Sequence, residues 1–320
     1  MNEQTSALAA SAIPLPIPGK VIDPPPMEVA GTVRKIDDKS RVAGIAFRAY
    51  VRFTFAKATL LAAGTTYYLF LAIFALIALA FGITALIGSE ALSQAVTEAL
   101  NKAFPGLIGE AGINTAQLRS IGSATSIVGF LVLLYSGGGA MEAANSSIHQ
   151  IYGAPKDSRN FLVSKVRLIG WMLMIAPLIL ASFAPSILVT NFAQPIVEAV
   201  GLPTSLLVLI SLIVSLALNY LIVWLLLGHM GGIQPERTPR MVGSAIGAVG
   251  VELLKYLMAS IVAFSVAKPQ YGAFAAPIAV LFVLYLLTVV LYSSAAITGG
   301  IAEKDEPLPE VPNEQPPSGD

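Results

Sequence analysis

Residues 60–87 read LLAAGTTYYLFLAIFALIALAFGITALI, a stretch without a single charged side chain. The hydrocarbon core of a bilayer is about 30 Å thick, so a helix that spans it needs about 20 apolar residues. Backbone groups inside lipid must be hydrogen-bonded within the protein, which favours a helix. The stretch lacks the apolar and polar alternation of a membrane strand. It therefore predicts a transmembrane helix.

Five further blocks of the same kind follow, at residues 121–140, 168–192, 202–227, 242–266 and 273–301. Hydrophobic residues make up 55% of the chain and charged residues 12%, whereas soluble domains carry about 25% charged residues. The sequence predicts an all-α, polytopic membrane bundle of six transmembrane helices within residues 39–302. The Pro-rich residues 1–38 and the acidic, Pro-rich residues 303–320 are predicted to be disordered tails.

Basic residues are sorted onto alternate connections between the six blocks. They gather before the first block, between the second and third, between the fourth and fifth, and after the sixth. The other connections hold only Lys102, Arg119 and Lys268, and Lys255 lies inside a block. Because cytoplasmic loops carry the excess of Lys and Arg, both termini are predicted to be cytoplasmic.

Two amphipathic helices are predicted to lie at the membrane surface. Residues 39–55 place three arginines on a narrow arc of a helix: Arg41, Arg48 and Arg52. We expect this arc to face anionic headgroups at the inner interface. Residues 88–120 place three apolar side chains at helical spacing: Leu92, Val96 and Leu100. They predict a short helix on the outer surface, with a plain ordered loop as the alternative.

Ionisable residues within the apolar blocks are the first candidates for function, because charge is costly inside a membrane. Glu252 and Lys255 lie well inside the fifth block, on one helix face at a spacing of three, so they can neutralise each other. They either line a substrate or proton path or form a structural ion pair that faces the bundle interior. Asn219 in the fourth block is expected to be a hydrogen-bond donor between helices.

The second block ends in three consecutive glycines, Gly137, Gly138 and Gly139, which lead into Glu142 and Asn145. Glycines weaken a helix and let a neighbouring backbone approach closely. One hypothesis is a hinge beside a polar cavity, and the other is close helix packing at the inner interface. Tyr67 and Tyr68 lie within the first block, and we expect one of them to face the interior. We include Glu142, Asn145 and Tyr67 with Glu252 and Lys255 as candidates for a substrate pathway.

Other features indicate packing. Gly243 and Gly247, continued by Gly250, form a small-residue face on the fifth block. Pro277 in the sixth block is expected to kink its helix, as are Pro177 and Pro185 in the third. The two histidines, His149 and His229, are expected to be solvated near the cytoplasmic surface.

The chain offers little for catalysis or cofactors. It has no Cys and only two His, and it lacks a P-loop, a dinucleotide-binding fingerprint, an H-E-x-x-H motif and a nucleophile elbow. We expect no enzyme activity, no catalytic residue, no metal and no cofactor. The formal net charge is zero, which argues against a nucleic-acid partner.

Several short motifs, in this order and spacing, resemble the YihY/BrkB family of bacterial inner-membrane proteins over about residues 41–303. They include AAGTTYY at residues 62–68 followed by Phe74, and GAMEAANSSIHQIY at residues 139–152 followed by RNF at 159–161. Further matches are Gly243-Ser244-Ala245, Tyr271-Gly272 and Leu284-Tyr285. The chain departs from the family at Ala72, Ala75, His149 and the triplet Ser294-Ala295-Ala296, where the family's acidic residue is missing.

The resemblance implies a location in the bacterial inner membrane and a role in envelope integrity, serum resistance or transport. Our first hypothesis is a protein that transports or flips a lipid or another envelope component, with membrane lipids as partners. The second is an envelope scaffold that does not transport. The third is the family's former label of ribonuclease BN, which no feature of these residues supports. Six spans are few for a lone transporter, so a homo-oligomer is left open.

Overall fold

The computed structural model describes most of the membrane-spanning part of the chain. Its continuous described segments are residues 39–88, 122–153, 165–172, 204–230, 235–266 and 275–302. Single described positions also occur at residues 32, 35, 36, 90, 93, 94, 96, 97, 174, 175, 178, 179 and 182.

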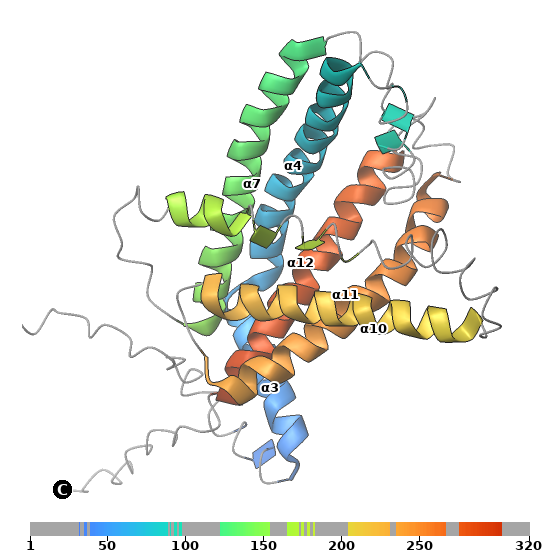
Figure 1. The fold of residues 1–320 in the computed structure, drawn as a ribbon. Helices are drawn as coiled ribbons and strands as arrows, with labels where there is room; N and C mark the ends of the chain where they lie inside the picture. Colours follow the sequence, from blue (N-terminus) through green and yellow to red (C-terminus); the bar gives the residue numbers. More distant parts are fainter. Residues whose placement is uncertain are drawn as a thin grey trace, which may run out of the picture.

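All regular structure in this described part is helical (Figure 1). The elements are α3 (Arg41–Phe55), α4 (Ala58–Ile87), α7 (Gly122–Tyr152), α10 (Thr204–Leu225), the π-helical turn η2 (Leu226–Met230), α11 (Arg237–Val266) and α12 (Ala275–Ala302). Five of them are long and apolar enough to cross a membrane, namely α4, α7, α10, α11 and α12. The predicted third span, residues 168–192, and the two predicted tails lie largely outside the described residues, so six spans stay a prediction.

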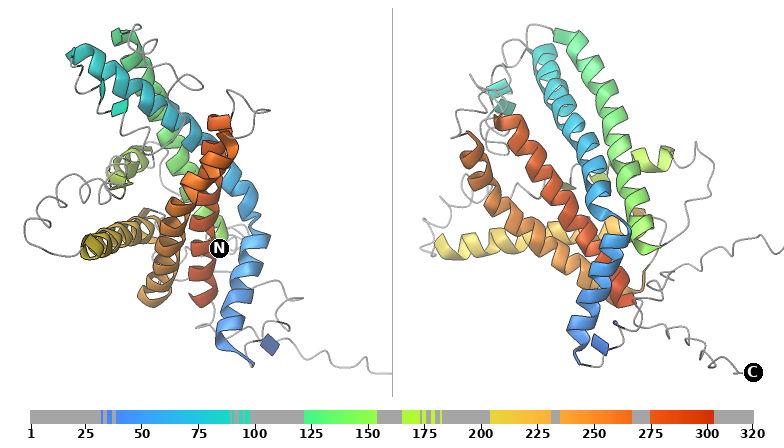
Figure 2. Two further views of the ribbon diagram at one scale, coloured as in Figure 1. Left: turned by 90° about the vertical axis from the view of Figure 1, so that its right-hand side faces the viewer. Right: turned by 180° about the vertical axis from the view of Figure 1, so that it is seen from behind.

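Helices α4 and α7 run antiparallel and pack along most of their length (Figures 1 and 2). Gly129 of α7 makes a close approach possible: a Cβ there would lie 2.9 Å from the backbone nitrogen of Leu79. Helix α12 packs against α4 on one side and α11 on the other, while α10 crosses α11 at a steep angle and appears almost end-on in the left view of Figure 2. Large apolar side chains remain exposed on these helices, as expected of surfaces that face lipid.

The interior of the bundle combines apolar packing with short polar contacts. Tyr152, Tyr292 and Leu227 are fully buried in the largest cluster. Thr65 Oγ1 lies 2.5 Å from the hydroxyl oxygen of Tyr292, which joins α4 to α12. Such small hydroxyl residues allow helices to approach closely in a membrane.

The arginine arc of α3 does not have the orientation expected from the sequence. Arg48 and Arg52 are buried, and they donate to carbonyl oxygens at the ends of neighbouring helices. Arg48 Nε lies 2.8 Å from the oxygen of Gly300 in α12. Arg41 alone of the three is exposed. The expectation that the arc faces lipid headgroups is therefore wrong for Arg48 and Arg52, because helix carbonyls accept their hydrogen bonds instead.

Three further expectations can be compared with the structure. His149 is buried rather than solvated, with 7% of its surface exposed. Pro277 lies in the first turn of α12, where a backbone N–H has no helical acceptor, so the helix runs on without the kink we expected. In the outer segment, the described positions from 90 to 97 are helical, and Val96 packs against Phe81 and its neighbours. Leu92, Leu100, Pro177 and Pro185 lie outside the described residues.

Candidate functional site

Helix α11 positions the first candidate pair. Its glycine face packs on α12: a Cβ at Gly247 would lie 2.5 Å from Ser294 Oγ, and one at Gly250 would lie 2.7 Å from Val290 Cγ1. A Cβ at Gly243 would overlap the Thr298 side chain. At about 100° per residue, Glu252 and Lys255 lie on the opposite half of α11. Gly243 and Gly247 thus lie against α12, and this packing directs both charges away from α12.

Five side chains meet on that half of α11, and we call them the polar cluster: Ser182, Ser215, Asn219, Glu252 and Lys255. Glu252 Oε2 accepts hydrogen bonds from Ser215 Oγ and Asn219 Nδ2, both at 2.7 Å. Lys255 Nζ donates to the carbonyl oxygen of Ser182 at 3.0 Å, to Ser215 Oγ at 3.1 Å and to Asn219 Oδ1 at 3.2 Å. Glu252 and Lys255 also form an ion pair at 3.5 Å.

The burial of this cluster explains why so many partners are needed. The side chains of Glu252 and Lys255 are only 12% and 15% exposed, and Asn219 and Ser215 are buried. A buried charge is tolerated when it is paired and its remaining hydrogen-bonding positions are filled. An ammonium group has three N–H donors, and acceptors surround Lys255 Nζ on several sides. The opposite charges of Glu252 and Lys255 balance each other, and the exposed 12% and 15% of their side chains leave the pair accessible from one edge.

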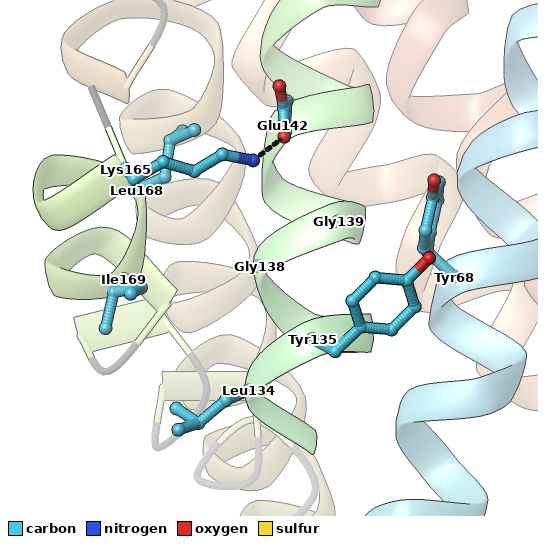
Figure 3. A pocket seen from close by; sticks show the side chains of 9 residues that line it. All are labelled: Tyr68, Leu134, Tyr135, Gly138, Gly139, Glu142, Lys165, Leu168 and Ile169. Atoms are coloured by element: carbon cyan, nitrogen blue, oxygen red, sulfur yellow. Dashed lines mark hydrogen bonds and ion pairs between the residues drawn. The ribbon is translucent and has the colours of Figure 1, made fainter. Parts of the chain in front are cut away.

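A second group surrounds a pocket of about 330 Å³ between α4, α7 and the helical segment 165–172 (Figure 3). Glu142 of α7 forms an ion pair with Lys165 at the edge of this pocket. Tyr68 and Tyr135 line it with their rings in an edge-to-face arrangement, 6.3 Å between centroids. Here an ion pair and two aromatic rings border one cavity.

Three of the five predicted pathway residues belong to these two groups, whereas Asn145 and Tyr67 do not line the pocket. Glu252 and Lys255 belong to the polar cluster, whereas Glu142 borders the pocket. Asn145 lies about one turn further along α7 and is half-buried. Tyr67 is 57% exposed on α4 and packs edge-on against Tyr68 at 5.4 Å. Among the described contacts, none joins the two groups.

Two members of the polar cluster were not singled out in the sequence. Ser215 precedes Asn219 by four residues, so the two share a face of α10. That spacing in an otherwise apolar helix was a usable signal. Ser182 carried no comparable signal, because its role depends on which helices are neighbours. Asn219 donates to Glu252 across the α10–α11 contact, which confirms its expected role between helices.

The three consecutive glycines have different environments. Helix α7 continues through them without interruption. A Cβ at Gly139 would lie 2.5 Å from the ring of Tyr68, and one at Gly137 would lie 2.5 Å from Met172 Sδ. Gly138 has no such neighbour within 4 Å and lines the pocket. The contacts of Gly137 and Gly139 favour close packing over a hinge, whereas Gly138 borders the open space of the pocket.

Comparison with known proteins agrees with the sequence motifs. No curated protein and no solved structure matches the chain. The family model described as virulence factor BrkB matches residues 49–317. That range contains α4, α7, α10, α11 and α12, and hence both groups of candidate residues. The chain therefore belongs to the virulence factor BrkB family.

Proposed function

We propose that this chain is a transporter of the bacterial cytoplasmic membrane that moves or flips a lipid or another envelope component. Both termini would be cytoplasmic, and the polar cluster would lie on the path of the substrate. The proposal includes no enzymatic step.

The single observation that carries the proposal is the polar cluster. Glu252 and Lys255 are placed near the middle of α11, a helix long and apolar enough to cross a membrane. Ionisable residues at such positions are expensive, and they commonly mark substrate or proton pathways. Their 12% and 15% exposure leaves an edge through which a polar group could replace one of the internal hydrogen bonds.

A specific observation also favours the alternative, an envelope scaffold that does not transport. Each charged atom of the cluster already has several partners, from α10 and from Ser182. In the scaffold, the sole role of this network would be to hold α10 against α11. The two functions differ in what happens when both charges are removed together.

The test is transport by the purified full-length protein in liposomes. Fluorescent phospholipids report flipping through quenching of the outer leaflet, and labelled solutes report uptake. The informative variant is the double substitution Glu252→Gln with Lys255→Met, because removing both charges leaves no uncompensated buried ion. Glu236→Gln with Arg237→Met is the matched control, since these two charges are exposed at the start of α11.

We expect the double variant to fold with an unchanged thermal midpoint and to lose at least about tenfold in transport rate, a barrier change of about 1.4 kcal/mol. The control variant should transport as the wild type does. Transport that survives in a folded double variant would remove the polar cluster from the mechanism. Absence of transport by the wild type across the lipids and solutes tried would favour the scaffold.

A further inference from the structure

The pocket between α4, α7 and segment 165–172 shares no residue with the polar cluster, and the proposed function does not use it. Its volume of about 330 Å³ falls in the range of small-ligand sites. One part of its lining is apolar and includes Leu134, while Glu142 and Lys165 stand at another edge (Figure 3). A ligand that fits must therefore be amphipathic, with a charged portion beside the ion pair.

The ion pair remains open to a ligand. The side chains of Glu142 and Lys165 are 52% and 39% exposed, and exposed ion pairs stabilise a fold very little. The hydrogen bond from Lys165 engages Oε2 of Glu142, and a carboxylate accepts at both of its oxygens. A positive group can thus approach Glu142 while a negative group approaches Lys165.

The two tyrosines add a second preference for a cation. Tyr68 and Tyr135 line the same pocket, and the faces of aromatic rings attract ammonium groups. A simple anion would be repelled by the carboxylate of Glu142 and by the negative face of either ring. A ligand that carries an ammonium and a phosphate together complements the whole site.

The sequence of α7 places this pocket at the depth of lipid headgroups. The helix is uncharged from Gly122 to Met141, about 20 residues, which at about 1.5 Å per residue matches a hydrocarbon core of about 30 Å. Glu142 is the first charge after that stretch. Tyr67 and Tyr68 lie opposite on α4, and tyrosines concentrate at the membrane–water interface.

Gly138 supplies the space for the ligand. A Cβ at this position would meet nothing within 4 Å, and the residue lines the pocket. Its neighbours Gly137 and Gly139 are covered by Met172 and Tyr68. Gly138 and Gly139 both line the cavity, and Gly138 is the one of the three at which an added Cβ would meet open space.

We propose that this pocket binds the headgroup of a phospholipid in which a phosphate is linked to a primary ammonium, with the ammonium at Glu142 and the tyrosine rings and the phosphate at Lys165. The acyl chains would extend along the apolar surface toward Leu134. The site does not depend on the proposed transport, because an envelope scaffold could bind lipid in the same way.

Binding is measured on the full-length protein in detergent by native mass spectrometry, with phosphatidylethanolamine and phosphatidylglycerol titrated in parallel. Soluble phosphoethanolamine is added as a competitor to separate a lipid from a free headgroup. Gly138→Leu places a larger side chain in the pocket from a position where the added Cβ itself meets nothing within 4 Å. Gly64→Leu is the matched control, because Gly64 is an exposed glycine of α4 that also has nothing within 4 Å of a Cβ.

We expect wild-type protein to bind phosphatidylethanolamine about tenfold more tightly than phosphatidylglycerol, the gain of roughly one charge-assisted hydrogen bond. Glu142→Gln should abolish that preference, Lys165→Met should weaken both lipids, and Gly138→Leu should remove the preferred binding while Gly64→Leu retains it. Glu142→Lys combined with Lys165→Glu keeps an ion pair but exchanges its charges, so it should fold without recovering the preference.

Equal binding of the two lipids by the wild type would overturn the proposal. So would a preference that persists in folded Gly138→Leu or Glu142→Gln protein. Competition by phosphoethanolamine at the concentrations at which the lipid binds would assign the site to a soluble ligand and overturn the assignment to a phospholipid. None of these readouts uses transport, so a failure of the proposed function leaves them unchanged.

Discussion

Three adjacent glycines of α7 should respond in three different ways to the same added methyl group. Gly138→Ala adds a Cβ with no neighbour within 4 Å, so it should stabilise the protein by up to about 1 kcal/mol through helix propensity. This is an upper limit, because membrane helices remain partly formed in the unfolded state within a membrane or detergent.

Gly139→Ala should act in the opposite direction. Its Cβ would lie 2.5, 2.6 and 3.1 Å from Cδ1, Cε1 and Cγ of Tyr68, whereas carbon atoms attract one another best at about 3.5–4.0 Å. The ring of Tyr68 must shift by about 1 Å, and such overpacking costs about 1–3 kcal/mol. After subtraction of the propensity gain, the net destabilisation should be roughly 0.5–2 kcal/mol.

Gly137→Ala is the internal comparison. Its Cβ would meet Met172 Sδ at 2.5 Å, but a methionine side chain has three rotatable bonds and a polarizable sulfur that adapts to new neighbours. The change in stability should therefore lie near zero. Substitution at the three positions separates crowding by a rigid ring, crowding by a flexible chain and open space, with the added group held constant.

The assay is equilibrium unfolding of the purified protein in mild detergent as the fraction of SDS is raised, followed by circular dichroism and tryptophan fluorescence. The expected order of stability is Gly138→Ala, then Gly137→Ala, then Gly139→Ala. If all three variants shifted in one direction by similar amounts, propensity alone would govern α7, and the packing of Tyr68 on Gly139 would be refuted. Tyr68→Ala combined with Gly139→Ala should remove most of the crowding term.

Three further substitutions test the contacts of α11 with α12 and α10 and the start of α12. Gly243→Ala should destabilise the protein by about 1–3 kcal/mol because its Cβ overlaps Thr298, and Thr298→Ala in the same chain should restore part of the SDS midpoint. Arg240→Lys should lower the thermal midpoint and alter the emission of Trp224, because Arg240 donates two hydrogen bonds to the Trp224 carbonyl and stacks 3.9 Å from its ring centre, an arrangement that lysine cannot reproduce. Pro277→Ala should leave unfolding unchanged within about 0.5 kcal/mol, since the first turn of α12 needs no N–H there; a loss above about 1 kcal/mol would show that the rigid ring fixes the start of the helix.

Hydropathy predicted where these helices lie more accurately than where they end. The ends of α4, α10 and α12 fall within about two residues of the predicted blocks, because apolarity stops where each helix stops. Helix α7 continues to Tyr152, well past the predicted end at Ala140. Its last turns carry Glu142, Asn145 and His149, and these polar side chains ended the predicted block although the helix continues. Backbone hydrogen bonds hold these turns in a helix, and a hydropathy profile does not measure such bonds.

The candidate site was predictable to the extent that it depends on a single helix. The spacing of Glu252 and Lys255 is sufficient to predict their ion pair, because neighbours at three residues share a face. Their surroundings depend on which helices pack together and in what register. The contact of Lys255 with Ser182 joins positions 73 apart in sequence, and no local pattern encodes it. The same limit applies to the separation of the two carboxylates: Glu142 follows the apolar part of α7 and Glu252 lies near the middle of α11, and neither position alone shows that they belong to different groups.

The arginines of α3 show how one sequence pattern can satisfy two physical demands. An arc of guanidinium groups at the edge of a membrane suits lipid phosphates, but it suits the C-terminal carbonyls of helices equally well. In the structure, Arg48 donates to Gly300 near the end of α12, and Arg52 donates to Tyr152 at the end of α7. Whether the arginines bind lipid phosphates or helix carbonyls depends on where the C-terminal ends of the neighbouring helices lie.

Three helix C-termini meet at this end of the bundle, because the Tyr152 hydroxyl of α7 also donates to the Leu227 carbonyl just beyond α10. Each C-terminus carries about half a negative charge, and Arg240 supplies α10 with the same kind of partner that Arg48 and Arg52 supply to α12 and α7. If Arg48 and Arg52 faced lipid headgroups instead, the carbonyl dipoles at the ends of α12 and α7 would lack these two cations. Helix α3 is therefore an integral part of the bundle: it places two cations where the dipoles of α7 and α12 converge, and its removal should loosen both helices at the same end.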